Sequence, residues 1–159
     1  MKKFLIPFLL FTFYVACSDS QEKAASSAQS VSNADETVQK ENPSYDPDRG
    51  TGKYKDVVVD QKLNVGIAKH GEKSFGVKCS SCHKLTNERL VGPGWKGVTS
   101  RYKPEWILNF MTNTDEMINK DPKVQAQLEI CLVRMPNQNL SDEEAKSLYE
   151  FMRKNDGVK

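Results

Sequence analysis

The sequence lacks a marked excess of charge of either sign. Its 159 residues include 23 Lys and Arg against 21 Asp and Glu, which gives a formal net charge of +2 at pH 7. It also lacks a run of basic residues interleaved with aromatic ones, the pattern typical of a nucleic-acid interface. We therefore expect no nucleic-acid partner.

No apolar run in the sequence is long enough to span a membrane. The longest uncharged apolar run, Phe4–Ala16, has 13 residues, whereas a spanning helix needs about 20. Lys2 and Lys3 precede it, so residues 1–16 resemble the signal peptide of an exported protein. Cys17 stands where a lipoprotein peptidase cuts, which predicts that Cys17 is acylated and anchors the chain to a bacterial membrane. Ordinary cleavage and an uncleaved anchor stay open, and all three place the folded part outside the cytoplasm.

Large apolar residues are almost absent between Ser18 and Tyr45, where Ser, Ala, Gln, Asn and acidic residues dominate. Such a composition cannot bury enough apolar surface to offset the entropy lost on ordering the chain. We therefore predict a flexible tether over residues 17–52 and a folded domain over residues 53–159. The tether either lets the domain reach several partners or only holds it clear of the membrane surface.

Cysteine and histidine are scarce, and most of them stand together. The chain has four Cys and two His, and three of these residues form the run Cys79-Ser80-Ser81-Cys82-His83. In a CxxCH run two thiols bond the vinyl groups of a haem while the imidazole reaches the iron. A structural zinc site needs four Cys or His ligands, and only His70 and Cys131 remain once Cys17 is acylated. A thioredoxin-like pair needs alternating strands and helices, which the flanking sequence does not predict.

Helical spacing precedes the CxxCH run and a glycine-rich loop follows it. Residues 64–78 predict a helix in which Gly71 and Phe75 share one face. Residues 91–98, with three glycines and a proline, are incompatible with a helix. The run therefore stands between a helix and a loop.

Three further helices are expected downstream. Pro104 and Pro122 each stand where proline favours the first turn of a helix. The helix from Pro122 is expected to bury Val124, Leu128 and Leu132. Ser141 and Glu144 form a capping box that starts a last helix, whose predicted buried face contains Ala145, Leu148, Phe151 and Met152. A Met135-Pro136 pair lies in the loop before it.

The order GxxxF, CxxCH, Gly-Pro loop and Met-Pro before a capped helix resembles the class I cytochromes c. The resemblance implies a mostly α fold of about four helices around one covalently bound haem c. It implies Cys79 and Cys82 as the attachment residues and His83 and Met135 as the axial ligands of the iron. It also implies that the Pro93 carbonyl accepts a hydrogen bond from the other ring nitrogen of His83, which orients the ring.

The resemblance extends to the packing around the haem. Gly71 and Phe151 match the residues at which the first and last helices of the family cross. Trp95 stands where the family commonly has an aliphatic residue, so we expect altered packing beside the haem. The downstream methionines that we interpret as core residues are Met111, Met117 and Met152.

For five further residues the sequence leaves more than one role open. Arg101, Tyr102 and Trp106 are candidates to bind the haem propionates, although Trp106 is equally interpretable as core. Cys131 is interpreted as core filler, with an intermolecular bridge as the second reading. His70 is expected to lie away from the distal side of the haem.

The resemblance implies an electron carrier rather than an enzyme. With His83 and Met135 on the iron no position is open to a substrate, and a methionine ligand raises the reduction potential. We expect single electrons to pass between respiratory redox proteins, toward a high-potential terminal reductase or oxidase. The alternative is a gas sensor or small peroxidase in which Met135 gives way. Residues 91–107 and 135–140 resemble lipoprotein cytochromes that accompany nitrous-oxide reductase, which makes that enzyme one candidate acceptor beside a terminal oxidase.

Overall fold

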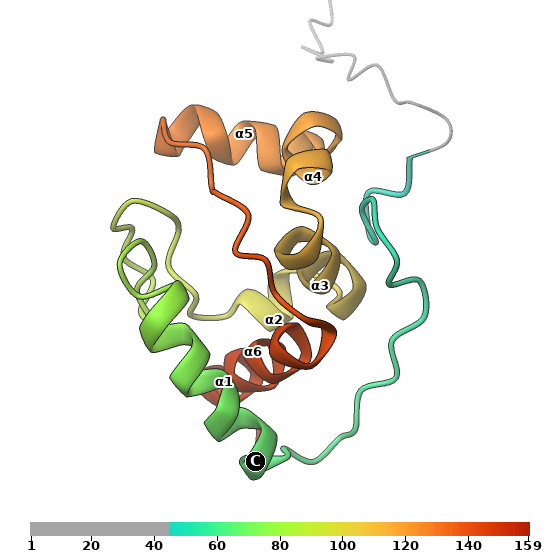
Figure 1. Ribbon diagram of the computed structural model, residues 1–159, viewed down its shortest axis with the longest axis vertical. Helices are drawn as coiled ribbons and strands as arrows, with labels where there is room; N and C mark the ends of the chain where they lie inside the picture. Colours follow the sequence, from blue (N-terminus) through green and yellow to red (C-terminus); the bar gives the residue numbers. More distant parts are fainter. Residues whose placement is uncertain (1–44) are drawn as a thin grey trace, which may run out of the picture. The chain divides into compact units, whose positions relative to one another are not determined.

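The computed structural model describes residues 45–159, and its regular elements are helices (Figure 1). They are α1 (Val65–Lys78), α2 (Val98–Arg101), α3 (Pro104–Thr112), α4 (Thr114–Lys120), α5 (Pro122–Cys131) and α6 (Asp142–Asn155). No β-strand occurs within residues 45–159, where a single antiparallel bridge pairs His83 with Arg89. The predicted mostly α fold is confirmed. Within the same residues no helix has both the length and the apolar character needed to cross a membrane.

The four predicted helices correspond to α1, α3, α5 and α6, and local signals start them. The side chains of Asn64, Asp121 and Ser141 each accept a backbone N–H of the first turn of α1, α5 and α6, at 3.0–3.1 Å. These bonds satisfy N–H groups that have no partner inside the helix. The capping box before α6 is complete, because Glu144 accepts the Ser141 N–H in return at 3.0 Å.

Two short helices, α2 and α4, add to the four that the sequence predicted. The first turn of α2 is capped from a distant part of the chain. The Asp156 carboxylate accepts the backbone N–H groups of Gly97 and Thr99 at 2.6 and 2.9 Å. A partner almost sixty residues away leaves no local signal, which explains why the sequence pattern missed α2.

The position of Leu132 corrects the sequence prediction. The sequence placed it on the buried face of the helix that begins at Pro122. In the structure Leu132 follows α5 in the left-handed region, at φ 58°, and is 84% exposed. The left-handed residue ends α5 one residue earlier than expected and turns the chain toward Met135.

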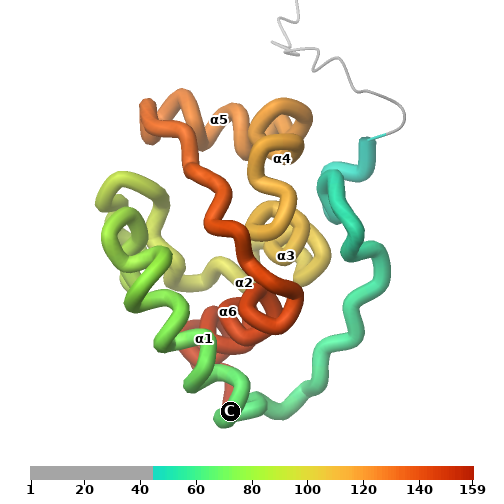
Figure 2. The backbone as a smooth tube through the Cα atoms, viewed as in Figure 1, coloured from blue at the N-terminus to red at the C-terminus, as the bar shows by residue number. Residues whose placement is uncertain are grey.

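Helices α1 and α6 cross at close range and form the base of the domain (Figure 2). A Cβ atom built on Gly71 would lie 1.9 Å from the Ser147 carbonyl oxygen and 2.8 Å from the Phe151 Cβ. The predicted crossing at Gly71 and Phe151 is therefore confirmed. The expected buried face of α6 is also confirmed, since Ala145, Leu148, Phe151 and Met152 are all at most 4% exposed.

An extended segment, residues 45–64, runs along the helices from α5 to the start of α1, and we call it the N-terminal strap (Figure 1). The buried Asn109 side chain on α3 accepts the Tyr54 N–H at 2.9 Å and donates to the carbonyls of Arg49 and Tyr54 at 2.9 and 2.8 Å. Residues 45–52, which the sequence placed in the tether, thus contact the helices. The predicted signal peptide and tether residues 1–44 lie outside the described residues.

Candidate functional site: a cavity beside the CxxCH run

A cavity of about 700 Å³ lies between the helices. It is lined by the CxxCH loop (residues 79–97), by the Met135 loop (residues 132–141) and by side chains of α1 to α6. Most of the lining residues are apolar or aromatic. Cofactor pockets in proteins have volumes of about 300–1,000 Å³, so this cavity has the size and character of a cofactor site.

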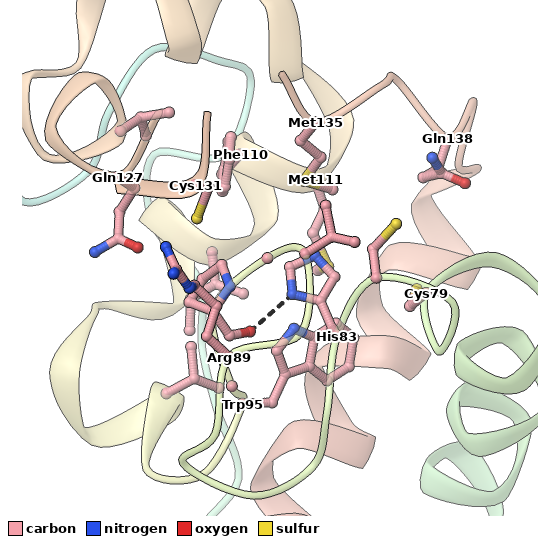
Figure 3. Close-up of a pocket in the computed structure, with 18 of the residues that line it drawn as sticks. Cys79, His83, Arg89, Trp95, Phe110, Met111, Gln127, Cys131, Met135 and Gln138 are labelled. Carbon is pink, nitrogen blue, oxygen red and sulfur yellow. Dashed lines mark hydrogen bonds between the residues drawn. The ribbon is translucent and has the colours of Figure 1, made fainter. Parts of the chain in front are cut away.

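The two thiols of the CxxCH run lie at the edge of this cavity (Figure 3). α1 ends just before them, and a tight turn follows in which the N–H groups of Cys82 and His83 donate to the Cys79 carbonyl at 3.0 and 2.9 Å. Both thiols are free rather than joined in a disulfide. Burial raises the pKa of the Cys79 thiol to about 11, so it is protonated at neutral pH. The turn presents two reduced sulfurs and one imidazole to the same cavity.

The His83 ring is held by the Gly-Pro loop. Its Nδ1 lies 2.9 Å from the Pro93 carbonyl oxygen, and Figure 3 marks this bond. Burial lowers the pKa of His83, although the bond to Pro93 opposes the shift, so the ring is neutral at pH 7. Because the carbonyl can only accept, Nδ1 carries the proton and Nε2 keeps its lone pair for a metal.

Gly92 allows the loop to approach the imidazole. A Cβ atom on Gly92 would lie 2.4 Å from His83 Cε1 and 3.0 Å from Nε2. Contacts this short do not occur between a side chain and a ring, so residue 92 must lack a side chain if the ring is to keep its place. The sequence showed the Gly-Pro pair, but only the structure shows that Gly92 itself faces the ring.

Trp95 packs behind the imidazole. Its ring centroid lies 5.6 Å from that of His83 and 4.8 Å from that of Phe75, and it is 7% exposed. The indole thus fills the space between α1 and the His83 ring. At this position the structure thus shows an aromatic contact between Trp95 and the His83 imidazole.

Met135 lines the cavity from the loop that joins α5 to α6, and in Figure 3 its side chain and the His83 ring both extend into the cavity. Both ends of this loop are fixed. Arg134 donates to Asp115 Oδ1 and Asn119 Oδ1, both at 3.2 Å, and the capping box at Ser141 fixes the other end. A thioether on a loop held at both ends is well placed to keep a constant position.

Three other sequence expectations have definite outcomes. Met111, Met117 and Met152 are at most 5% exposed, so their assignment to the core is confirmed. His70 is exposed on α1 and does not line the cavity. Cys131 is partly buried and lines the cavity at the end of α5.

Trp106 is a core residue rather than a free donor. Its indole N–H donates to Asp121 Oδ2 at 2.6 Å within the buried interior, and Asp121 also accepts the Tyr45 hydroxyl. Since the indole has a single N–H, it has none left for a propionate. Arg101 and Tyr102 remain candidates, and both line the cavity. Cys17 lies outside the described residues.

The charge of the cavity wall was not visible from the sequence. Among residues 45–159, four cationic side chains and no Asp or Glu line the cavity. They are Lys78, Arg89, Arg101 and Arg134. Such a wall suits a large apolar group that carries negative charge. A haem with its two propionate groups fits this description, and the thiols, imidazole and thioether match its vinyl groups and its iron.

The site therefore defines a c-type haem protein, and comparisons with known proteins agree. The family model described as Cytochrome c matches residues 68–156. A solved structure of cytochrome c from Rhodothermus marinus is similar, with a TM-score of 0.64 and 31% identity over 66% of this chain and 90% of that one. An engineered form of that cytochrome has a TM-score of 0.63 and 30% identity at the same coverage.

A curated relative is similar over a shorter range. The cytochrome c-type protein cyt cy of Rhodobacter capsulatus is 42% identical over 45 residues, which cover 28% of this chain and 23% of the relative. The match thus spans less than a quarter of that relative's length. The chain belongs to the cytochrome c family, as a class I cytochrome c with covalently bound haem c.

Proposed function

We propose that this cytochrome passes single electrons between respiratory proteins through an iron held by His83 and Met135. The observation that carries the proposal is the cavity that the CxxCH loop and the Met135 loop share. Cys79 and Cys82 would attach the haem at the cavity edge, and the two axial side chains come from loops that separate elements hold in place. When bound, the haem would supply a one-electron couple between ferric and ferrous iron.

We expect the two proposed ligands and their neighbours to determine the reduction potential of the iron. The Pro93 carbonyl holds the His83 ring in one tautomer and makes it a better donor. A Met135 thioether stabilises ferrous iron and raises the reduction potential. A high potential suits transfer toward a terminal reductase or oxidase, and nitrous-oxide reductase is the acceptor to test first.

The mouth of the cavity supports direct contact with another protein. Three aliphatic side chains that line the cavity are also exposed to solvent by 54–84%. They are Val77, Ile130 and Val133. Electron transfer needs the haem edge close to the partner's cofactor, and an apolar rim there favours a brief contact that excludes water. An exposed apolar group of this kind is typical of an interaction site.

A carbon monoxide experiment separates this function from the gas-sensor or peroxidase alternative. If Met135 holds the sixth position, reduced wild-type protein should bind carbon monoxide slowly or not at all at neutral pH. The shift of the Soret band measures this binding. Rapid binding would show that the sixth position is open and would favour the alternative. Reduced protein should also transfer electrons to purified nitrous-oxide reductase or a terminal oxidase in stopped-flow mixing.

We also propose export and acylation at Cys17, which rest on the signal sequence alone. Cys17→Ser should prevent acylation and cleavage by the lipoprotein peptidase. A cleavable secretory signal placed before Glu41 should release a soluble red domain. Mass spectrometry of the mature N-terminus checks the proposal, since an unmodified residue there would indicate ordinary cleavage instead.

A further inference from the structure

Two of the four cations on the cavity wall already have counter-charges outside it. Lys78 Nζ lies 2.7 Å from Glu144 Oε1, and Arg134 Nη2 lies 3.2 Å from Asp115 Oδ1. Both carboxylates stand outside the lining of the cavity. The charges of these two side chains are therefore balanced without a ligand.

Arg89 and Arg101 have no such balance within residues 45–159. Arg89 Nη1 donates to the Ile130 carbonyl, and Arg101 donates to the carbonyls of Lys96 and Gly94. Neither guanidinium lies in an ion pair in this part of the chain. Both arginines are exposed, so solvent balances their charge, and each guanidinium keeps N–H donors for an anion at the cavity wall. The two arginines match in number the two carboxylates of a haem.

Arg89 also lies on the correct side of the cavity. In Figure 3, Arg89, Gln127 and Cys131 lie on one side of the His83 ring and Cys79 lies on the other. The vinyl groups and the propionates of haem occupy opposite edges of the macrocycle. If the vinyl edge is bonded at the CxxCH run, the propionate edge would extend toward the side of the cavity where Arg89 lies.

We propose that Arg89 binds one haem propionate and links it to α5 through the Ile130 carbonyl. One N–H of the guanidinium bonds Ile130, and the group has five donors in total, so a pair remains for a carboxylate in the planar two-bond geometry. Gln127, which lies on the same side of the His83 ring in Figure 3, carries no charge that would compete for the guanidinium. The sequence indicated Arg101 for a propionate but gave no signal for Arg89. The proposal rests on the haem and its His83 ligand, and not on any partner protein.

The test is the reduction potential of the holo-protein and its pH dependence. Arg89→Gln removes a positive charge that opposes ferric iron, so the midpoint potential should fall. It also removes the ion pair that keeps the propionate ionised, so the pH at which the potential changes should move upward. Arg89→Lys keeps the charge but loses the two-bond geometry, and should show smaller shifts of the same sign.

Lys84→Gln is the matched control. It removes one positive charge from the same loop, where Lys84 pairs with Glu88 at 2.8 Å and does not line the cavity. It should change the potential little and leave its pH profile in place. If neither Arg89 variant differs from this control, Arg89 only ties the CxxCH loop to α5 and the proposal is overturned. Should Arg89→Gln fail to mature, Arg89→Lys decides alone. Rapid carbon monoxide binding by the wild type would overturn the proposed carrier function without bearing on Arg89.

Discussion

Gly71 of α1 lies directly against the backbone of Ser147 in α6, and the space between the two helix backbones admits no side chain larger than a hydrogen atom. Gly71→Ala would place a Cβ 1.9 Å from the Ser147 carbonyl oxygen, and a backbone atom cannot rotate aside as a side chain can. We expect the helices to separate and the free energy of unfolding to fall by about 1–3 kcal/mol or more. Denaturant unfolding of the haem-loaded protein measures the change.

Gly76→Ala on the same helix is the control for Gly71. No atom lies within 4 Å of a Cβ at Gly76, so this change should raise stability by about 0.5–1 kcal/mol through the greater helix propensity of alanine. Equal effects of the two changes would show that helix propensity, and not the crossing, governs position 71.

Gly92→Ala should disturb the ring of His83, the proposed axial ligand, without removing it. A Cβ 2.4 Å from His83 Cε1 forces the ring or the loop to move, which weakens the bond from Nδ1 to Pro93. A less basic imidazole stabilises ferric iron less, so the reduction potential should rise. Electron paramagnetic resonance of the oxidised protein and redox titration check this. Gly66→Ala, where the nearest atom is at 3.4 Å, should leave both measurements unchanged.

Met135→Ala should lower the reduction potential by a sizeable fraction of the range of about 0.8 V that axial ligands span. The weak sulfur-to-iron absorption band of the oxidised protein should disappear. Met111→Ala is the control, because Met111 also lines the cavity and is 5% exposed. It should keep the band and cost about 2–5 kcal/mol of stability. Loss of the band in the Met111 variant alone would assign the ligand to Met111.

Tyr54 makes stability depend on pH in alkaline solution. Burial, and then the nearby Asp142 carboxylate, raise the pKa of Tyr54 from 10.0 to about 12. Below pH 10 the hydroxyl is neutral in both states. Above pH 10 the unfolded chain loses this proton first, so the free energy of unfolding falls until the pH reaches about 12. In Tyr54→Phe this decrease should be smaller, as urea unfolding between pH 7 and pH 11 would show.

The same variant also tests the unpartnered Tyr54 hydroxyl. It is buried and has no hydrogen-bond partner within residues 45–159, so Tyr54→Phe should be as stable as the wild type, or more so, at pH 7. Tyr45→Phe is the contrasting change, because the Tyr45 hydroxyl donates to Asp121. It should lower stability at pH 7. A greater loss from Tyr54→Phe than from Tyr45→Phe would contradict this assignment.

The sequence predicted those parts of the fold whose signals are local. Asn64, Asp121 and Ser141 cap the helices that follow them within three residues. The spacing of apolar residues that predicts the buried face of α6 is likewise contained within that helix. Each such signal couples neighbours in the chain, so it survives without knowledge of the rest of the molecule.

What the sequence missed depends on residues far apart in the chain. The cap of α2 comes from Asp156, and the N-terminal strap is held by Asn109, which is more than fifty residues from Tyr54. The position of Cys131 on the cavity wall depends on how α5 ends at Leu132. For the site, the CxxCH run and the Met-Pro pair were readable as motifs. Arg89 was not, because its proposed role depends on a cavity that only the fold creates. Within residues 45–159 no carboxylate lines that cavity.

The strap has a mechanical consequence. A pull on the chain before residue 45 acts first on the Tyr45–Asp121 bond and then on the bonds from Asn109 to Arg49 and Tyr54. These contacts belong to α3 and to the start of α5, on a different part of the domain from the crossing of α1 with α6. Tension from the N-terminal side is therefore resisted first by α3 and the start of α5, before it reaches the bonds that Asp60, Gln61 and Asn64 make with α6.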